Sequence, residues 1–212
     1  MGAARRDSLT LLRLLLEALM EHAKLRGSGV SKTRIVSATG LNPYSFNNYI
    51  MQARRSGGVL FRTETGRTYY EPTYRTALIT WALGLVANIL EPPRSVLEKY
   101  EELLRNLEER LVDAGVMLRK CLGGEECSIP SDAILECRGR LHKLYVAVEG
   151  DPLNDIRALA LLESVSHGEE TLLLLEPACR DSLIGVLASS LGIDSYSDVE
   201  SLAASVAARC AG

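Results

Sequence analysis

A short segment at residues 44–55 gathers side chains that are suited to polar recognition. Tyr44, Ser45, Asn47 and Asn48 come first, and a pair of arginines at 54–55 follows. An amide side chain both donates and accepts hydrogen bonds, so it can pair with a group that does the same. A guanidinium binds anions such as phosphate. The segment therefore combines groups that can read a polar surface with groups that can hold an anion.

The same segment has the pattern of a helix. Asn42 can cap its first turn, and Pro43 occupies the first helical position, where a missing N–H costs nothing. Apolar side chains recur on one face at i, i+4 and i+7, namely Phe46, Ile50 and Ala53. Gly57 and Gly58 end the helix. The polar residues, with Met51, are therefore expected on the face opposite the core.

Other elements surround this helix in a recognisable order. A leucine-rich helix capped by Ser8 precedes it and ends at Gly27 and Gly29, and a short helix runs from about Ser31 to Ala38. After it, β-rich runs at 59–63 and 67–71 flank a turn at 64–66 and predict a hairpin. This is the element order of a winged helix-turn-helix, which we expect at residues 1–75.

A helix in this position can enter the major groove of DNA with its first half against the base edges. The helix start at 31–33 can hold a phosphate, and Arg62 and Arg67, beside the hairpin tip, can enter the minor groove. The predicted DNA-binding residues are Ser31, Lys32, Thr33, Tyr44, Ser45, Asn47, Asn48, Arg54, Arg55, Arg62 and Arg67. The alternative is a fold of this kind used for protein contacts, with a merely solvated polar face.

Charge is distributed unevenly along the chain. Residues 1–75 carry 12 Lys and Arg against 5 Asp and Glu, a net charge of +7. Residues 76–212 carry 12 against 22, a net charge of −10. A basic segment attracts a polyanion, so we expect the amino-terminal third to bind double-stranded DNA and the acidic remainder to stay off it. The alternative is that the excess of arginines arose by chance and reflects no polyanion partner.

The sequence resembles archaeal winged-helix regulators in three segments, residues 31–41, 45–60 and 66–73. The last run resembles the way that family ends its wing in a tyrosine, then a threonine, then a long helix. The resemblance covers about a third of the chain. It implies a transcriptional regulator that binds palindromic DNA as a homodimer.

Residues 76–113 are expected to form a helical connector of two helices, one ending near Leu90 and one spanning 95–113, with Pro92 and Pro93 between them. An apolar row on the first helix, made of Trp81, Leu85 and Ile89, is either a dimer seam or a surface that packs on the amino-terminal domain.

Residues 114–212 read as an α/β domain. Expected strands lie at 116–121, 133–138, 141–149 and 171–175, and expected helices at 154–165, 180–191 and 197–209. With the helix that precedes it, this order resembles the core of the restriction-endonuclease-like superfamily. That family places an Asp at the start of its second core strand, and a Glu, one spacer and a Lys at the end of the third. Asp132 and Glu149 match, but Asp151 stands where the lysine belongs.

In active members, as the resemblance implies, two carboxylates hold a divalent metal and the lysine orients or activates the attacking water. Asp151 instead adds negative charge, so Asp132, Glu149 and Asp151 are candidates for a vestigial metal site. Lys143 lies roughly 20 Å away along a strand and is too far to substitute. Arg157 on the next helix is a conceivable replacement. We expect no nuclease activity, no bound metal and no cofactor.

Three interpretations of this half stay open. It is a degenerate, non-catalytic module for dimerisation or for binding a protein partner; an active metal-dependent nuclease that uses Asp132 and Glu149; or a different α/β fold. In the third case Asp132 and Asp151 are simply turn and helix-cap residues. The sequence as a whole predicts an α+β protein that regulates transcription, with a replication or chromatin accessory factor as a further alternative.

The five cysteines form no CxxC pair, so a structural zinc site is not expected. We expect buried free thiols. Gln52 is the only glutamine, which is a weak mark of a hyperthermophile, and in such a source a disulfide between Cys121 and Cys127 is conceivable. No apolar run is long enough to span a bilayer and no targeting signal is found, so we expect a cytoplasmic protein that does not bind membranes.

Overall fold

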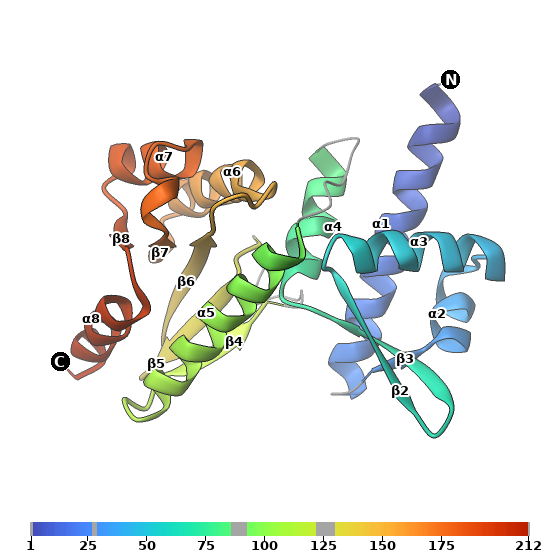
Figure 1. Cartoon of the computed structure of the whole chain (residues 1–212), viewed down its shortest axis with the longest axis horizontal. Coiled ribbons are helices and arrows are strands. Elements are labelled where there is room, and N and C mark those ends of the chain that lie inside the picture. Colours follow the sequence, from blue (N-terminus) through green and yellow to red (C-terminus); the bar gives the residue numbers. More distant parts are fainter. Residues whose placement is uncertain (1, 27–28, 86–92, 122–129, 212) are drawn as a thin grey trace. The chain divides into compact units, whose positions relative to one another are not determined.

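The structure is a computed structural model, and it describes residues 2–26, 29–85, 93–121 and 130–211 (Figure 1). It is a mixed α+β protein, which confirms the predicted class. The described residues fall into two compact units. Unit 1 contains the described residues up to Leu85 together with Pro130. Unit 2 contains the other described residues, from Pro93 onward. No helix in these ranges combines the length and the apolar character that crossing a membrane requires.

Unit 1 contains four helices and one small sheet among its described residues. Its elements are α1 (Gly2–Arg26), β1 (Val30–Ser31), α2 (Lys32–Thr39), α3 (Pro43–Arg55), β2 (Val59–Glu64), β3 (Arg67–Pro72) and α4 (Arg75–Leu85). The sheet order is β1-β3-β2, antiparallel throughout. The core lies between α1 and the following helices, where Leu15, Leu16, Ile35 and Phe46 are completely buried.

The hairpin of β2 and β3 forms as predicted. Glu64 pairs with Arg67 across a turn in which both Thr65 and Gly66 have positive φ, at 48° and 75°. Two positive φ angles are what a two-residue hairpin turn requires, and glycine adopts them without steric cost.

Two details at the start of unit 1 differ from the prediction. The first helix begins at Gly2, so Ser8 lies within it instead of capping it. The short strand β1 was not predicted, because two residues are too few to show a period. Gly29, expected only to help end the helix, precedes β1 where a Cβ would come within 2.9 Å of the Cβ of Tyr69. The close approach of β3 therefore requires a glycine there.

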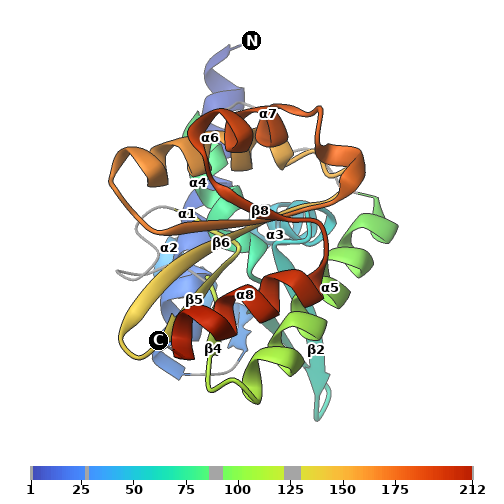
Figure 2. The ribbon, with the colours of Figure 1, turned by 90° about the vertical axis from the view of Figure 1, so that its left-hand side faces the viewer.

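Unit 2 is a five-stranded sheet covered by helices on both faces (Figure 2). Its elements are α5 (Arg94–Val112), β4 (Met117–Lys120), β5 (Ala133–Cys137), β6 (Arg140–Ala147), α6 (Asn154–Ser166), β7 (Thr171–Leu175), α7 (Leu183–Leu191), β8 (Asp194–Tyr196) and α8 (Val199–Ala211). Strands β4, β5 and β6 are antiparallel neighbours, and β6, β7 and β8 are parallel.

Helices α6 and α7 connect the parallel strands and lie on one face of the sheet, while α5 and α8 lie on the other (Figure 2). Strand β7 reads TLLLL and is buried from its second residue on, because it runs between two strands with helices above and below. Strand β8 was not predicted. Its sequence, Asp194-Ser195-Tyr196, is polar, as suits the edge of the sheet.

The helices expected as a separate connector at 76–113 pack in different units. Helix α4 packs on α1 in unit 1, and α5 packs on β4 and α8 in unit 2. Trp81 is half-buried. The remainder of the predicted seam, Ile89 and the side chain of Leu85, lies outside the described residues.

The expectation of free buried thiols is wrong for three of the described cysteines, because Cys121, Cys137 and Cys210 are each part of a disulfide. Cys137 on β5 and Cys210 on α8 form a disulfide with their Cα atoms 5.9 Å apart. They are 73 residues apart in sequence and meet only because α8 packs back across the sheet. Cys179 is free and buried, as expected. The conceivable pair of Cys121 with Cys127 lies outside the described residues, because Cys127 is not among them.

Candidate functional site

Helix α3 is fixed at its start by the predicted cap. The side chain of Asn42 accepts hydrogen bonds from the backbone N–H groups of Tyr44, at 3.1 Å, and Ser45, at 2.8 Å. The predicted core face is buried and consists of Phe46, Ile50 and Ala53. Because this face determines the rotation of α3 about its axis, residues half a turn away must project outward.

The outward face of α3 forms one side of an open hollow of about 560 Å³. Its lining comes from α3 and from one residue of α1, and consists of Ser8, Tyr44, Ser45, Asn48, Tyr49, Met51, Gln52 and Arg55. Tyr44 is 76% exposed. The hollow brings together four predicted site residues: Tyr44, Ser45, Asn48 and Arg55. The sequence interpretation missed Tyr49 and Gln52, although the position of Gln52, four residues after Asn48, was a signal for it.

Asn47 and Arg54, which were predicted with this set, lie on its flank and have contacts within the protein. The side-chain oxygen of Asn47 accepts a hydrogen bond from Nζ of Lys32 at 2.9 Å. The same Nζ lies 5.2 Å from the centroid of the Phe46 ring. The guanidinium of Arg54 stacks over Phe61 of β2, at 4.6 Å from the ring centroid. A side chain held in this way is less available to a ligand than one that projects into the hollow.

The start of α2 places the predicted phosphate-holding residues as expected. Ser31 is the N-cap residue with extended backbone, and its side chain makes no capping hydrogen bond. Thr33 is exposed, and Lys32 is half-buried because it reaches toward Asn47.

The two wing arginines differ in their surroundings. Arg67 is exposed and borders the turn at the hairpin tip. Nε of Arg62 lies 3.0 Å from a carboxylate oxygen of Glu71 and 3.3 Å from one of Glu64, so its charge is balanced along the hairpin. Arg67 is therefore the better placed of the two to meet an anion beyond the tip.

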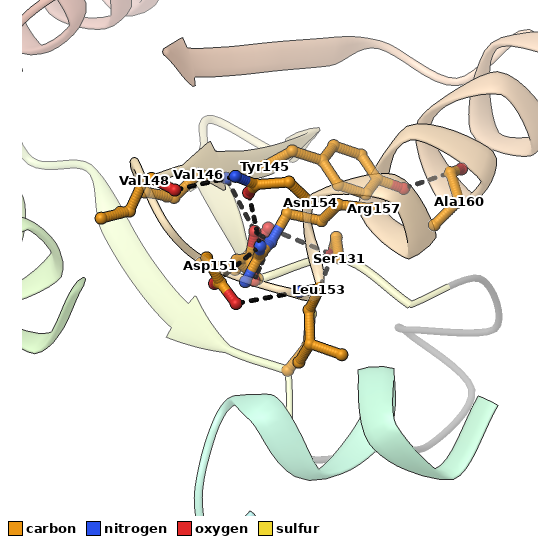
Figure 3. A network of polar contacts seen from close by, with 12 residues as sticks. Ser131, Tyr145, Val146, Val148, Asp151, Leu153, Asn154, Arg157 and Ala160 are labelled. Atoms are coloured by element: carbon orange, nitrogen blue, oxygen red, sulfur yellow. Dashed lines mark hydrogen bonds and ion pairs between the residues drawn. The ribbon is translucent and has the colours of Figure 1, made fainter. Parts of the chain in front are cut away.

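Unit 2 contains a different cluster, built around a buried arginine (Figure 3). Nε of Arg157 on α6 donates to both carboxylate oxygens of Asp132, at 3.1 and 2.9 Å. Nη1 donates to Oδ2 of Asp151 and to Oδ1 of Asn154, both at 3.0 Å. The side chains of Arg157, Asp132 and Asp151 are 0–1% exposed. A guanidinium thus occupies the space between the two carboxylates.

Comparisons with protein-family models, with characterised proteins and with solved structures return no match to this chain. What the two clusters can do must therefore follow from their geometry.

Arg157 is kept in its charged form by its surroundings. Burial by itself lowers the pKa of a guanidinium, but the negative charges of Asp132 and Asp151 outweigh this effect and raise the pKa of Arg157 well above its ordinary value. The ring of Tyr100 on α5 lies 5.1 Å from the guanidinium carbon and provides a further favourable contact. Nη2 makes no hydrogen bond within the described residues.

The carboxylates of this cluster also satisfy backbone groups. Oδ2 of Asp132 accepts from the N–H of Val146 on β6 at 2.7 Å, and Oδ1 of Asp151 accepts from the N–H of Leu153 at 3.0 Å, just before α6. The plain turn and helix-cap roles considered for these two residues are therefore wrong, because Asp132 bonds to strand β6 and the N-cap residue of α6 is Leu153. The hydrogen bonds join β5, β6 and α6 into one buried network (Figure 3).

The vestigial metal site predicted at Asp132, Glu149 and Asp151 does not assemble. Glu149 is exposed and stands apart from the pair, and its backbone N–H donates to the carboxylate of Glu176 at 2.7 Å. Within the described ranges no three His, Cys, Asp or Glu side chains are grouped so that they could hold a metal ion.

Neither of the two cations considered as substitutes for the missing lysine is open to a ligand. Arg157 is fully buried between its partners. Lys143 is 7% exposed, and its Nζ lies 2.7 Å from the carboxylate of Glu169.

Proposed function

We propose that unit 1 is a winged helix-turn-helix that binds double-stranded DNA in a sequence-dependent manner, and that the protein is a homodimeric transcriptional regulator. The observation that carries the proposal is the outward face of α3, which is polar, exposed and hollowed opposite a fully buried core face. A recognition helix needs such a face, because base edges are read only by side chains that reach past the helix backbone.

The elements around α3 support the same role. Helix α2 precedes it by a three-residue connection at 40–42, and the β2–β3 hairpin follows it directly. The first-turn groups of α2 and the exposed Arg67 at the hairpin tip flank α3 in sequence and would meet phosphates on either side of a groove. The net charge of +7 on residues 1–75 provides the long-range attraction to DNA.

Unit 2 is proposed as a non-catalytic module with a restriction-endonuclease-like core. Its order of α5, three antiparallel strands, α6 and the parallel β7 supports that assignment. Its lack of activity is supported by Arg157, because a permanently charged guanidinium between Asp132 and Asp151 leaves no place there for a divalent cation. A metal-dependent nuclease would need both the cation and an open path for the phosphate.

The dimer is proposed to form through the outer faces of α6 and α7, which we call the α6–α7 surface. It consists of Leu159, Leu162, Leu183 and Val186, which are 41–52% exposed. Helices α6 and α7 contact each other and lie on the same face of the sheet (Figure 2). Together the four side chains present on the order of 300 Å² of apolar area, which is at the lower end of the range for the largest, often functional, patch on a protein surface.

A second copy of the chain is the occupant that fits this surface. No charged residue occurs from Leu183 to Ile193, which includes all of α7, although α6 carries Asp155 and Glu163, and residues 76–212 carry a net charge of −10. Two acidic copies can approach each other without strong repulsion only through a neutral area. A standard interface buries about 800 Å² per partner, roughly 65% of it apolar in homodimers, so the four side chains would supply about half of the apolar part.

A titration with salt tests DNA binding most directly. Duplex binding by the full chain is measured by fluorescence anisotropy at increasing KCl concentrations. We expect the logarithm of the binding constant to fall linearly with the logarithm of salt concentration. Arg67→Ala, and Arg54→Ala combined with Arg55→Ala, should reduce the slope by about one for each phosphate contact that is lost.

Arg180→Ala is the matched control, because Arg180 is an exposed arginine of the acidic unit. It should leave the slope unchanged. An affinity that does not depend on salt, or a double arginine variant with wild-type behaviour, would exclude unit 1 as a DNA-binding domain. A cytoplasmic location, and recruitment of a protein partner by the acidic unit, are further parts of the proposal. A replication or chromatin accessory role would show the same binding without effects on transcript levels.

A further inference from the structure

We infer that the preferred DNA target of unit 1 contains A·T base pairs and that Asn48 and Gln52 each read an adenine edge in the major groove. The inference rests on the proposed function, since it requires that α3 lies in the groove. The inferred DNA target is thus an A·T-containing site, and the two residues that select it are on α3.

Asn48 and Gln52 are placed as a pair. They are four residues apart on α3, so they lie on the same face about 6 Å apart along the helix axis. Both are exposed and both line the hollow. Neither side chain makes a hydrogen bond within the described residues. Their carboxamide groups are therefore open to a ligand that meets the outward face of α3.

The chemistry of a carboxamide selects adenine. Adenine presents an N6 donor beside an N7 acceptor in the major groove, and the oxygen and NH₂ of an Asn or Gln match this pair in a bidentate contact. Guanine presents two acceptors there and is matched by a group with two donors, such as arginine. The arginines of α3 lie at its carboxyl-terminal end, and Arg54 stacks on Phe61. Of the residues that line the hollow, only Arg55 carries a guanidinium, and it stands at the end of α3 beyond the two amides.

The apolar residues of the hollow favour the same base pairs. Met51 and Tyr44 are 40% and 76% exposed, and both line the hollow beside Asn48. In each A·T pair the thymine methyl group lies in the major groove next to the adenine edge, and apolar side chains contact it. A surface of two amides bordered by a thioether and an aromatic ring therefore complements A·T pairs in both its polar and its apolar parts.

Asn47 provides an internal contrast. It is also an exposed asparagine of α3, but its side-chain oxygen already accepts a hydrogen bond from Lys32 at 2.9 Å, and it does not line the hollow. Its carboxamide cannot use that oxygen for a bidentate contact without losing Lys32. If the geometry governs specificity, Asn47 and Asn48 must behave differently even though they are neighbours of the same type.

Selection of duplexes from a random pool by the full-length protein tests the inference. The wild type should enrich A·T pairs at two or more positions. Asn48→Ala and Gln52→Ala should each lose the preference at one position, by on the order of 5- to 100-fold in relative affinity, the range for one bidentate contact. Asn47→Ala should retain the wild-type preference. Asn48→Arg should shift the preference at its position from adenine to guanine.

The outcomes separate this inference from the proposed function. Salt-dependent binding without A·T enrichment, or an unchanged preference in both the Asn48→Ala and Gln52→Ala variants, would overturn the inference and leave duplex binding intact. Absence of salt-dependent binding to any duplex would overturn both. All substituted side chains are exposed, and retained binding to random duplex at low salt would show that a variant is folded.

Discussion

Arg157 and Asp132 form a fully buried ion pair in which one nitrogen of the guanidinium contacts both oxygens of the carboxylate. Asp151 contacts the next nitrogen, so two negative charges flank one positive charge in the interior of unit 2. The arginine lies between the two carboxylates, where a bound cation could otherwise lie, and its charge offsets one of their two negative charges. The ion pairs thus tie the segment before β5 and the segment before α6 to α6 itself.

Replacement of Arg157 by alanine is expected to destabilise unit 2 strongly. Removal of one partner of a buried ion pair leaves an uncompensated charge and costs about 3–5 kcal/mol. Denaturation with guanidinium chloride, followed by circular dichroism, measures the change. Arg180→Ala, on the exposed surface of the same unit, is the control and should change stability by less than about 0.5 kcal/mol. Equal stability of the two variants would contradict the structural role of Arg157.

Plasmid DNA is expected to stay intact in the presence of the protein with Mg²⁺ or Mn²⁺. The reason is that Arg157 takes the place of a cation between Asp132 and Asp151, while Glu149 stands apart from them. Agarose gels of supercoiled plasmid provide the measurement. Glu149→Ala serves as the comparison, because Glu149 is exposed and its replacement leaves the buried network unchanged. Nicking by the wild type that disappears in Glu149→Ala would establish a nuclease.

Disruption of the α6–α7 surface is expected to convert a dimer into a monomer. Leu162→Asp combined with Val186→Asp places two charges on the apolar area and adds repulsion between two acidic copies. Light scattering coupled to gel filtration measures the mass in solution. Leu25→Asp is the matched control, since Leu25 is a 72% exposed leucine of unit 1 and should leave the mass unchanged. A monomeric wild type, or a double variant that stays dimeric, would exclude this interface.

Loss of the Cys137–Cys210 disulfide is expected to lower the stability of unit 2. The bond closes a loop over 73 residues of sequence and, by the entropy of loop closure, stabilises the folded state by about 4 kcal/mol. Cys210→Ser should therefore unfold at a clearly lower denaturant concentration. Cys179→Ser, at the free buried cysteine, is the control for the loss of a thiol. A Cys210→Ser variant as stable as the wild type would show that the bond adds nothing to stability.

Much of the local structure followed from short-range patterns. The cap of α3 by Asn42, its core face and the hairpin with a turn at 64–66 were all predicted from residues close together in sequence, and the structure shortens that turn to Thr65-Gly66. Strands too short or too polar to show a period were missed, namely β1 and β8. Element boundaries also shifted: the helix expected at 180–191 begins at Leu183, after a short 3-10 turn at Pro177–Cys179.

The candidate site was only partly predictable. Asn47 and Asn48 are adjacent and chemically identical, so composition and helical period gave both the same role. The two asparagines differ in their contacts, because Nζ of Lys32, at the start of α2, reaches the oxygen of Asn47, whereas Asn48 lines the hollow. Gln52 was overlooked although it shares the face of Asn48.

The sequence by itself determined most of the helical and extended segments, the apolar face of α3, and that the net positive charge lies in the first 75 residues. Each of these properties is set by residues within one or two turns of each other. Tertiary structure alone decided the pairs that join distant segments: Arg157 with Asp132, 25 residues away, and Cys137 with Cys210, 73 residues away. Such pairs depend on how strands are ordered in the sheet and how helices pack on it, and no local period in the sequence records that order.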